Sequence, residues 1–345
     1  MQLSDFDYEL PEELIAQEPL AERDASRMLV VNRETQTWTD ETFKSFPDYV
    51  KSNDVIVVNN TRVFPARLIG ERDPTGGRVE VLLAREVGES VWEALVRPGH
   101  RLKVGARVLF GSQLRAEVVD DASEQGFRRL KFEGELPLDE LLEKLGQTPL
   151  PPYIKRPGGT SPGDRIRYQT VFANVRGAIA APTAGLHFTP QVIETIRARG
   201  AAVAEVTLHV GYGTFEPVRV NDISAHRVSP ESFDISTECA RLINKARKQN
   251  GRVIAVGTTT TRALESSASD QGMIEAESGQ TKLTITPGFR FRAVDALLTN
   301  FHLPQSSLLL LVSAFAGYEL TMSSYRFAVA NRFRFYSYGD CMLVV

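Results

Sequence analysis

The chain has 345 residues, 42% hydrophobic and 24% charged, so its length predicts two domains with ample material for a core. Its two cysteines offer neither a disulfide framework nor a metal-ligand cluster, and its acidic start lacks the layout of a signal peptide. The net charge of −3 argues against indiscriminate coating of nucleic acid, although it leaves a specific RNA site open. The longest apolar run is far shorter than the roughly 20 residues that span a bilayer. We therefore expect a cytoplasmic protein that does not bind a membrane.

The predicted secondary structure changes in kind within the first 150 residues. Residues 28–31 and the following RETQTWT predict a strand, a turn and a second strand, followed by a short helix around 40–50 and a buried strand over 54–61. Between Phe64 and Gly134, about six short β-type segments follow one another without a helix, which predicts a small barrel or sandwich. A helix over 138–146 closes this region, and the Pro- and Gly-rich residues 149–164 predict a long loop.

Strands and helices alternate in the rest of the chain. Strands are predicted over 177–181, 201–210, 252–257 and 281–286, and helices over 190–200, 236–251, 261–268 and 306–316. This alternation is typical of an α/β layer structure. The expected fold is therefore a mixed-sheet α/β domain built from both chain ends, residues 1–62 and 150–345, with an inserted small all-β barrel domain over residues 63–149.

The segment AAPTAGLHFTP, residues 180–190, places His187 directly before a helix start, with Thr189 as the N-cap and Pro190 at the first helical position. Small residues between a strand and a helix let the backbone approach a ligand, as at the carboxyl ends of strands in open α/β sheets. A tight packing turn with a hydrogen-bonded histidine explains the segment, taken by itself, at least as well.

Histidines recur at predicted strand ends and turns in the second half of the chain, at His187, His209, His226 and His302. Histidine carries protons near neutral pH, so four such positions favour a pocket, although a single motif-free histidine usually only satisfies a hydrogen bond. His100 is expected in a solvated loop. No histidine has the spacing of a zinc site, so no metal is expected.

GTTTTRALES, residues 257–266, follows a predicted strand and opens a helix. Its glycine and hydroxyl groups suit an anionic or hydroxyl-rich ligand, while ordinary capping of the helix explains the same residues equally well. Three carboxylates are also of interest for the site, those of Glu216, Glu265 and Asp295. Asp295 lies in an otherwise apolar strand and needs a partner if it is buried.

Two stretches combine positive charge with aromatic residues, over 153–159 and 325–340. Aromatic rings can stack on splayed bases while Arg and Lys hold the backbone, so these stretches are candidate RNA contacts. The second stretch is equally typical of a helix that buries its rings and exposes its arginines. The residues of this hypothesis are Tyr153, Lys155, Arg156, Arg332 and Arg334.

Taken together in chain order, several long motifs carry a resemblance that covers nearly the whole chain. They are FDYELPEELIAQEPLAERDASRMLV, DVIVVNNTRVFPARL, YQTVFA, AAPTAGLHFT, TLHVGYGTFEPV, RVIAVGTTTTRALES, TNFHLPQSSLLLLVSAFAG and RFRFYSYGDCML. The chain resembles the S-adenosylmethionine:tRNA ribosyltransferase-isomerase family of queuosine biosynthesis. The family fold, an α/β domain bearing an inserted β-barrel, agrees with the organisation expected above.

The resemblance implies a reaction. Family members transfer and isomerise the ribosyl part of S-adenosylmethionine onto 7-aminomethyl-7-deazaguanine at the wobble position of tRNA, giving epoxyqueuosine and releasing adenine and methionine. S-adenosylmethionine is then a co-substrate, and no metal or bound redox cofactor is implied. We expect a monomer. The rival hypotheses are an S-adenosylmethionine-dependent tRNA methyltransferase, disfavoured because no glycine-rich fingerprint follows the first strand, and a non-catalytic tRNA-binding module.

We expect one pocket formed by the turns at 183–187, 208–215, 257–262 and 300–302, since ligands bind at the carboxyl ends of strands. Candidate catalytic residues are His187, His209, His302 and Asp295. Candidate residues for the S-adenosylmethionine pocket are Thr183, Gly185, Gly211, Gly213, Gly257, Thr258, Thr259 and Arg262. Within this pocket, His187 is expected to be neutral beside the ribosyl unit, and Gly185 to leave space for the ligand.

The chain departs from the family pattern in one functional stretch, where members usually carry HxMHxE. Here it runs from His226 to Glu231, with Ser229 in place of the second histidine, so no role of that histidine is carried over. Gln305 and Ser307 also replace a frequent lysine and threonine. The most distinctive motifs remain, and an active enzyme is expected.

Overall fold

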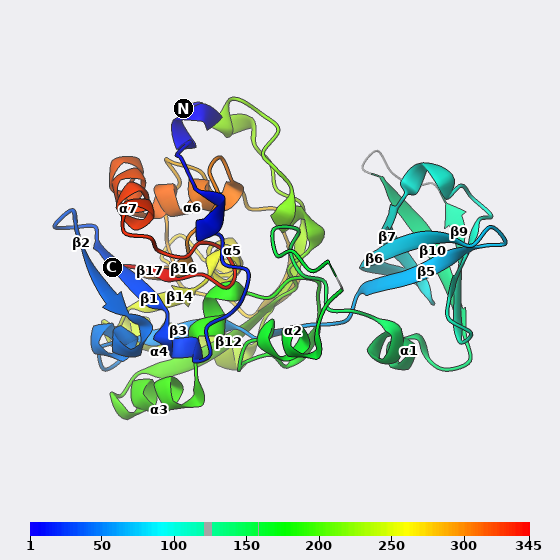
Figure 1. Ribbon diagram of the computed structural model, residues 1–345. Helices are drawn as coiled ribbons and strands as arrows, with labels where there is room; N and C mark the ends of the chain where they lie inside the picture. The colour runs from blue at the N-terminus through cyan, green and yellow to red at the C-terminus, as the bar shows by residue number, and fades with distance from the viewer. Residues whose placement is uncertain (121–125, 158) are drawn as a thin grey trace.

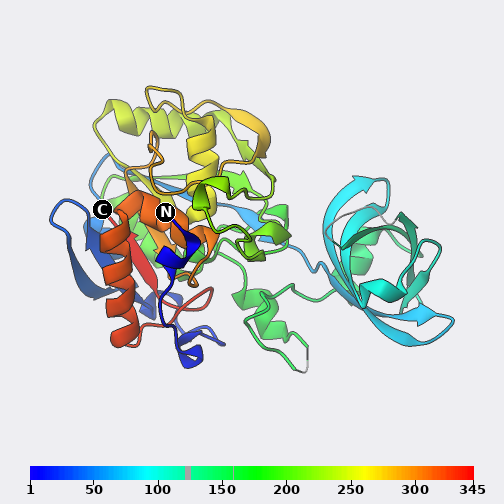
Figure 2. The same cartoon turned by 90° about the horizontal axis from the view of Figure 1, so that it is seen from above.

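The computed structural model describes residues 1–120, 126–157 and 159–345, and it divides into a large α/β domain and a smaller barrel set to one side of it (Figure 1). The expected fold class is confirmed, because a mixed sheet with helices carries an inserted, closed, six-stranded barrel. Seen from above, extended connections link the barrel to the α/β domain (Figure 2).

The α/β domain is built on a nine-stranded sheet in the order β15-β13-β12-β3-β14-β16-β17-β1-β2. The neighbours β12, β3, β14 and β16 are parallel, whereas β17 runs antiparallel to β16 and parallel to β1. The strands are β1 (Arg27–Asn32), β2 (Thr37–Thr42), β3 (Val55–Asn59), β12 (Ala202–Leu208), β13 (Glu231–Ile235), β14 (Val253–Val256), β15 (Glu277–Thr281), β16 (Ala296–Asn300) and β17 (Cys341–Val344).

Helices cover both faces of this sheet, which is why its central strands are continuous apolar runs. In β3, Val55 and Val57 pack in the core on the side of four helices, while Ile56 and Val58 pack on the opposite side. The four helices are α4 (Thr237–Lys248), α5 (Thr258–Ser267), α6 (Ser307–Ala316) and α7 (Tyr318–Ala330). The opposite face is covered by α3 (Pro190–Ala198) and the 3-10 helix η4 (Phe43–Tyr49).

The barrel closes in the strand order β10-β7-β6-β5-β8-β9, with every neighbouring pair antiparallel. Its strands are β5 (Arg67–Asp73), β6 (Gly77–Gly88), β7 (Val91–Arg97), β8 (Arg107–Phe110), β9 (Leu114–Asp120) and β10 (Phe127–Gly134). Alternate residues such as Leu68, Val81 and Leu130 fill its interior. The chain enters and leaves the barrel side by side, because Arg67 forms a β-bridge with Gln147 just after α1 (Leu138–Leu145).

Short elements complete the chain. The loop after the barrel contains α2 (Pro162–Arg167), and a two-stranded parallel sheet joins β4 (Thr61–Val63) to β11 (Val175–Ala178). The remaining 3-10 helices are η1 (Leu3–Phe6), η2 (Glu12–Leu14), η3 (Arg23–Ala25), η5 (Gly99–Arg101), η6 (Thr183–His187), η7 (Tyr212–Phe215) and η8 (Ile223–Ala225).

Three expected elements differ in the structure. The strand expected over 177–181 is β11, which lies outside the main sheet. The helix expected around 40–50 begins only after β2 and is a 3-10 helix containing Pro47. The strand expected over 281–286 is wrong beyond Thr281, because side chains take up its backbone groups: Leu283 N–H donates to the Thr281 hydroxyl at 3.1 Å, and the Leu283 carbonyl accepts from Arg262 at 2.9 Å.

Of the helices in the described ranges, none alone is long and apolar enough to cross a bilayer, and only α6 and α7, bent by 117° at Gly317, reach that composition as a pair. Likewise, no group of three His, Cys, Asp or Glu side chains that could hold a metal ion occurs within the described ranges.

Candidate active site

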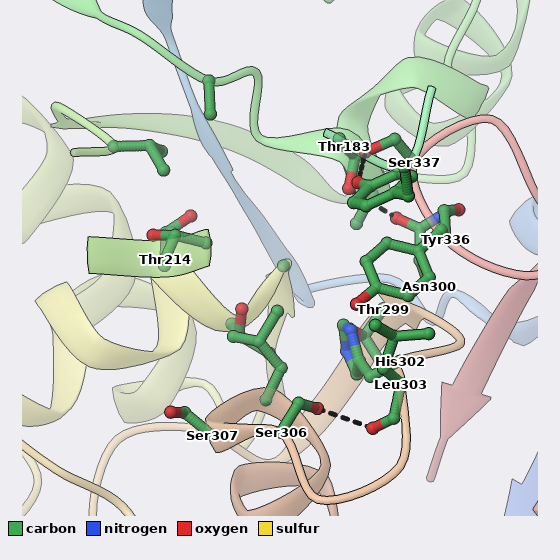
Figure 3. A pocket seen from close by; sticks show the side chains of 18 of the residues that line it. Thr183, Thr214, Thr299, Asn300, His302, Leu303, Ser306, Ser307, Tyr336 and Ser337 are labelled. Atoms are coloured by element: carbon green, nitrogen blue, oxygen red, sulfur yellow. Dashed lines mark hydrogen bonds between the residues drawn. The ribbon is translucent and has the colours of Figure 1, made fainter. Parts of the chain in front are cut away.

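A cavity of about 730 Å³, here called the first cavity, opens where β14 and β16 end (Figure 3). All four turns expected to share a pocket contribute to its lining: Thr183 and Ala184, Val210 and Thr214, Gly257 to Thr259, and Thr299, Asn300 and His302. The 303–308 segment and residues 336 and 337 also line it, as do residues 152, 153, 168, 180–182 and 216–218. The lining is therefore assembled at the carboxyl edge of the parallel strands, where open α/β sheets bind ligands.

The start of α5 faces this cavity. Gly257 adopts a φ of +92° between β14 and the helix, a conformation that glycine tolerates best, and Thr258 and Thr259 follow in the lining. The next two hydroxyls, of Thr260 and Thr261, donate back to the carbonyls of Val256 at 2.7 Å and Gly257 at 3.1 Å. All four threonines belong to α5; the first two line the cavity, while the hydroxyls of the next two bond back to the backbone.

His302 is the histidine that lines the first cavity. Its Nε2 lies 2.9 Å from the Thr299 hydroxyl, and its carbonyl accepts a hydrogen bond from the Tyr8 hydroxyl. Burial lowers the pKa of His302 to about 3, because the charged ring would lose its hydration. The imidazole is therefore neutral at physiological pH.

His187 lies behind the lining. Its Nδ1 is 2.7 Å from the Ser26 hydroxyl, and its Nε2 is 3.1 Å from the side-chain nitrogen of Asn300, which does line the cavity. Burial, followed by the positive charges of Arg23 and Arg334, lowers its pKa to about 4. The ring is neutral, as expected, but Asn300 stands between it and the cavity.

Gly185 also lies outside the lining, contrary to the expectation that it leaves space for a ligand. A Cβ atom at this position would approach Cγ2 of Thr170 to 2.9 Å. The missing side chain therefore makes room for protein packing. The sequence indicates that this turn needs a small residue. It does not show whether the space beside that residue is filled by a ligand or by the protein itself.

Arg262 and Gly211 belong to a network beside the cavity that is centred on the buried Glu231. Arg262 forms an ion pair with Glu231, whose other carboxylate oxygen accepts from the Gly211 N–H at 3.0 Å and the Thr214 hydroxyl at 3.2 Å. Because Thr214 lines the first cavity, this pair holds part of the cavity wall in place. Arg262 acts here as a structural partner, separated from the first cavity by the network it supports.

A second cavity of about 730 Å³ lies between the barrel and the α/β domain. His209, Gly211 and Gly213 line it instead of the first cavity, and Nδ1 of His209 is 2.8 Å from the Thr61 hydroxyl. Partial burial lowers the pKa of His209 below its ordinary value. Four aromatic side chains also line this cavity, those of Phe64, Trp92, Phe127 and Tyr212.

Asp295 is the candidate that the structure removes from the site. It precedes β16, at the opposite edge of the sheet from both cavities, and its carboxylate accepts a hydrogen bond from the Val253 N–H at 2.8 Å. Glu265 is similarly structural, since it accepts from the backbone N–H groups of residues 292 to 294. Both carboxylates have the partners that their positions require.

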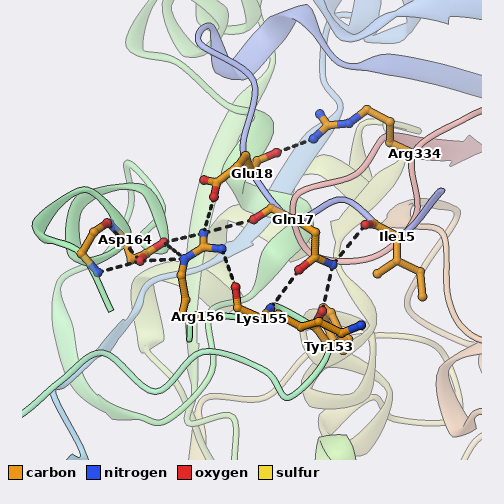
Figure 4. Close-up of polar contacts among 9 residues, drawn as sticks. Ile15, Gln17, Glu18, Tyr153, Lys155, Arg156, Asp164 and Arg334 are labelled. Atoms are coloured by element: carbon orange, nitrogen blue, oxygen red, sulfur yellow. Dashed lines mark hydrogen bonds and ion pairs between the residues drawn. The ribbon is translucent and has the colours of Figure 1, made fainter. Parts of the chain in front are cut away.

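The basic and aromatic candidates differ in exposure and partners, although Tyr153, Lys155, Arg156 and Arg334 all contact Gln17 or Glu18 (Figure 4). Tyr153 lines the first cavity, with its hydroxyl 2.5 Å from that of Ser337. Arg156 forms ion pairs with Asp164 at 2.9 Å and Glu18 at 3.1 Å, and Arg334 donates to the Glu18 carbonyl (Figure 4). Lys155 and Arg332 are exposed, although Lys155 pairs with Glu12.

Sequence reasoning missed the wall formed by Tyr168, Tyr336 and Ser337. The rings of Tyr153 and Tyr336 lie 3.8 Å apart between their centroids, although they come from opposite ends of the second half of the chain. The aromatic character of RFRFYSYGD was visible in the sequence, but it suggested RNA contacts. Only the fold shows that part of this segment faces the cavity.

The fold and the first cavity define a two-domain α/β protein with a ligand site at the carboxyl edge of its sheet. A family model described as "Queuosine biosynthesis protein" matches residues 3–344, and the chain belongs to this family of transferase and isomerase enzymes. Proteins named S-adenosylmethionine:tRNA ribosyltransferase-isomerase from Pelotomaculum thermopropionicum and Syntrophotalea carbinolica are each 50% identical to it, with complete coverage of both chains.

A solved structure extends the comparison to the fold. The crystal structure of S-adenosylmethionine tRNA ribosyltransferase from Thermotoga maritima is 38% identical, with a TM-score of 0.57 over 99% of this chain and 100% of that one. The expected family is thereby confirmed across both domains.

Proposed function

We propose that the protein transfers and isomerises the ribosyl moiety of S-adenosylmethionine onto 7-aminomethyl-7-deazaguanine at the wobble position of tRNA. The products are epoxyqueuosine-tRNA, adenine and methionine. S-adenosylmethionine acts as a co-substrate, without a further bound cofactor, and the enzyme works as a monomer in the cytoplasm. The family membership and the relatives' names support this reaction class.

The charge of the first cavity is the observation that carries the proposal. Among the described residues that line it there is no lysine or arginine, and its single carboxylate is that of Glu216. The lining histidine, His302, is held neutral by burial. A positive charge in the lining would repel a sulfonium cation at short range and weaken its binding. The sulfonium of the donor meets no such charge in this cavity.

The shape and polar groups of the first cavity suit the rest of the donor. About 730 Å³ lies within the range of small-molecule sites, and the lining is mainly apolar with a few convergent polar groups. Thr183 and Asn300, linked by a 3.0 Å hydrogen bond, offer partners for ribose hydroxyls or adenine nitrogens. The backbone N–H groups at the start of α5 suit the carboxylate of the methionine part.

Small-molecule chromatography tests the reaction. Incubation of the purified protein with S-adenosylmethionine and tRNA carrying the aminomethyl base is expected to release equal amounts of adenine and methionine. S-adenosylhomocysteine instead would identify a methyltransferase, and an unconsumed donor despite tRNA binding would identify a binding module.

Mass spectrometry of the digested tRNA tests the acceptor. Only tRNA that carries the deazaguanine precursor should gain the ribosyl unit, because plain guanine lacks the aminomethyl nitrogen that attacks it. A ribosyl adduct on unmodified guanine would contradict the proposed acceptor.

A further inference from the structure

The two large cavities share a wall. Of the residues that line them, Val210 and Glu216 belong to both. Val210 is apolar, so Glu216 is the charged group at the junction. A molecule in either cavity can therefore meet the same carboxylate.

The second cavity has the lining that a nucleobase needs. Phe64, Trp92, Phe127 and Tyr212 place aromatic rings around it, and the rings of Phe127 and Tyr212 approach to 6.2 Å from opposite domains. Aromatic faces stack on an unstacked base with little dependence on its identity. Discrimination between related bases must then come from polar groups.

Most carboxylates around the second cavity already have cationic partners. Glu93 pairs with Arg85 at 2.9 Å and Arg129 at 3.4 Å, while Glu231 pairs with Arg262 and Asp139 with Arg176. Glu86 is exposed on the barrel and does not reach the first cavity. These groups are therefore poor candidates for recognising a cation at the junction.

Glu216 is held differently. Its Oε2 accepts a hydrogen bond from the Ser229 hydroxyl at 3.3 Å, and its Oε1 lies 4.0 Å from a nitrogen of Arg219, whose side chain is 74% exposed. Close packing of Gly213 on Ser229 fixes the serine, since a Cβ on the glycine would lie 2.6 Å from that of Ser229. The carboxylate is thus oriented by a hydroxyl and only weakly neutralised.

We propose that Glu216 recognises the acceptor base by pairing with the positively charged aminomethyl group of its 7-substituent, while the aromatic second cavity holds the ring. This inference rests on the proposed function. The pairing places this nitrogen at the wall beyond which the donor lies, where the ammonium can pass a proton to the carboxylate and become the neutral amine that attacks. Guanine, which lacks this cation, leaves the carboxylate without a partner.

Binding of two matched tRNAs, without donor, tests this role. One tRNA carries the aminomethyl base at the wobble position and the other carries guanine. The wild type is expected to bind the first about 10- to 100-fold more tightly, the range for a hydrogen bond to a charged group. Glu216→Gln is expected to reduce this ratio to near one, whereas Glu89→Gln, an exposed charge-matched control on the barrel, keeps it.

A second variant separates recognition from folding. Ser229→Ala leaves the Glu216 carboxylate in place but removes the hydroxyl that orients it. The ratio of the two tRNA affinities is expected to fall about threefold, while the thermal melting temperature stays unchanged. An undiminished ratio in Glu216→Gln overturns the inference. If the wild type still releases adenine and methionine in that case, the proposed function stands without it; if the wild type neither turns over nor discriminates, both fail.

Discussion

The side-chain nitrogen of Asn300 lies 3.1 Å from Nε2 of His187 and separates that ring from the first cavity. The same asparagine accepts a 3.0 Å hydrogen bond from Thr183. A histidine that looked like a proton acceptor in the sequence is therefore a support for a polar residue of the cavity wall.

Replacement of His187 by alanine should weaken donor binding about tenfold, because Asn300 loses a hydrogen-bond acceptor. His187→Gln, whose amide oxygen can accept from Asn300, should restore most of the affinity. Isothermal titration with S-adenosylmethionine measures both variants. Full affinity in the alanine variant, or failure of the glutamine to restore it, would contradict a supporting role.

Stability should fall as the pH drops below about 6.5, the unfolded-state pKa of histidine. Between that value and about 4, His187 stays neutral in the folded protein while its unfolded form takes up a proton. Each such histidine contributes a slope of about 1.4 kcal/mol per pH unit in this window. Urea unfolding from pH 4.5 to 7 should show a shallower slope for His187→Gln than for the wild type.

Gly185→Ala should destabilise the fold by about 1–3 kcal/mol through overpacking against Thr170. Because the nearest atom is Cγ2 of Thr170, adding Thr170→Ser should recover part of the loss. Thermal unfolding of the single and double variants checks this. A stable Gly185→Ala variant with weakened donor binding would instead return Gly185 to the ligand side.

Glu231→Gln should cost about 3–5 kcal/mol, because it leaves the buried Arg262 without a counter-charge. Chemical unfolding measures the loss. Glu238→Gln is the matched control: it removes an exposed partner of Arg241 and should leave stability unchanged. Equal effects of the two substitutions would show that burial of the Glu231 pair does not matter.

RNA binding should depend on the two exposed cations of the candidate set. Lys155→Ala with Arg332→Ala is expected to flatten the salt dependence of tRNA affinity by about two units of slope, one for each phosphate contact. Arg334→Ala, which removes an internal contact with the Glu18 carbonyl, should leave the slope unchanged. A steep slope retained in the double variant would make both residues ordinary solvated side chains.

Local patterns predicted much of the architecture. The six barrel strands, the Thr189 cap and the four turns of the first cavity follow from hydrophobic periodicity and turn residues. These features depend on residues close together in the chain. The fold class could therefore be predicted from the sequence without knowledge of any tertiary contact.

The direction in which each side chain points could not be predicted from the sequence in this way. Whether His187 faces a ligand or Asn300, and whether Gly185 leaves room for a donor or for Thr170, is decided by segments more distant in the chain. The same holds for Tyr153, whose cationic neighbours suggested an RNA surface although its ring lies on Tyr336. Motif recognition thus identified the reaction class more readily than the task of each residue.

The position of β17 between β16 and β1 has a consequence for synthesis on the ribosome. The first strand of the large sheet pairs with the last strand of the chain, so β1 lacks this neighbour until Val344 has left the exit tunnel. The six barrel strands pair only with one another, so this sheet can form while translation continues. Until then β1 has one unpaired edge, and β3 lacks its sheet neighbours until β12 and β14 have been made.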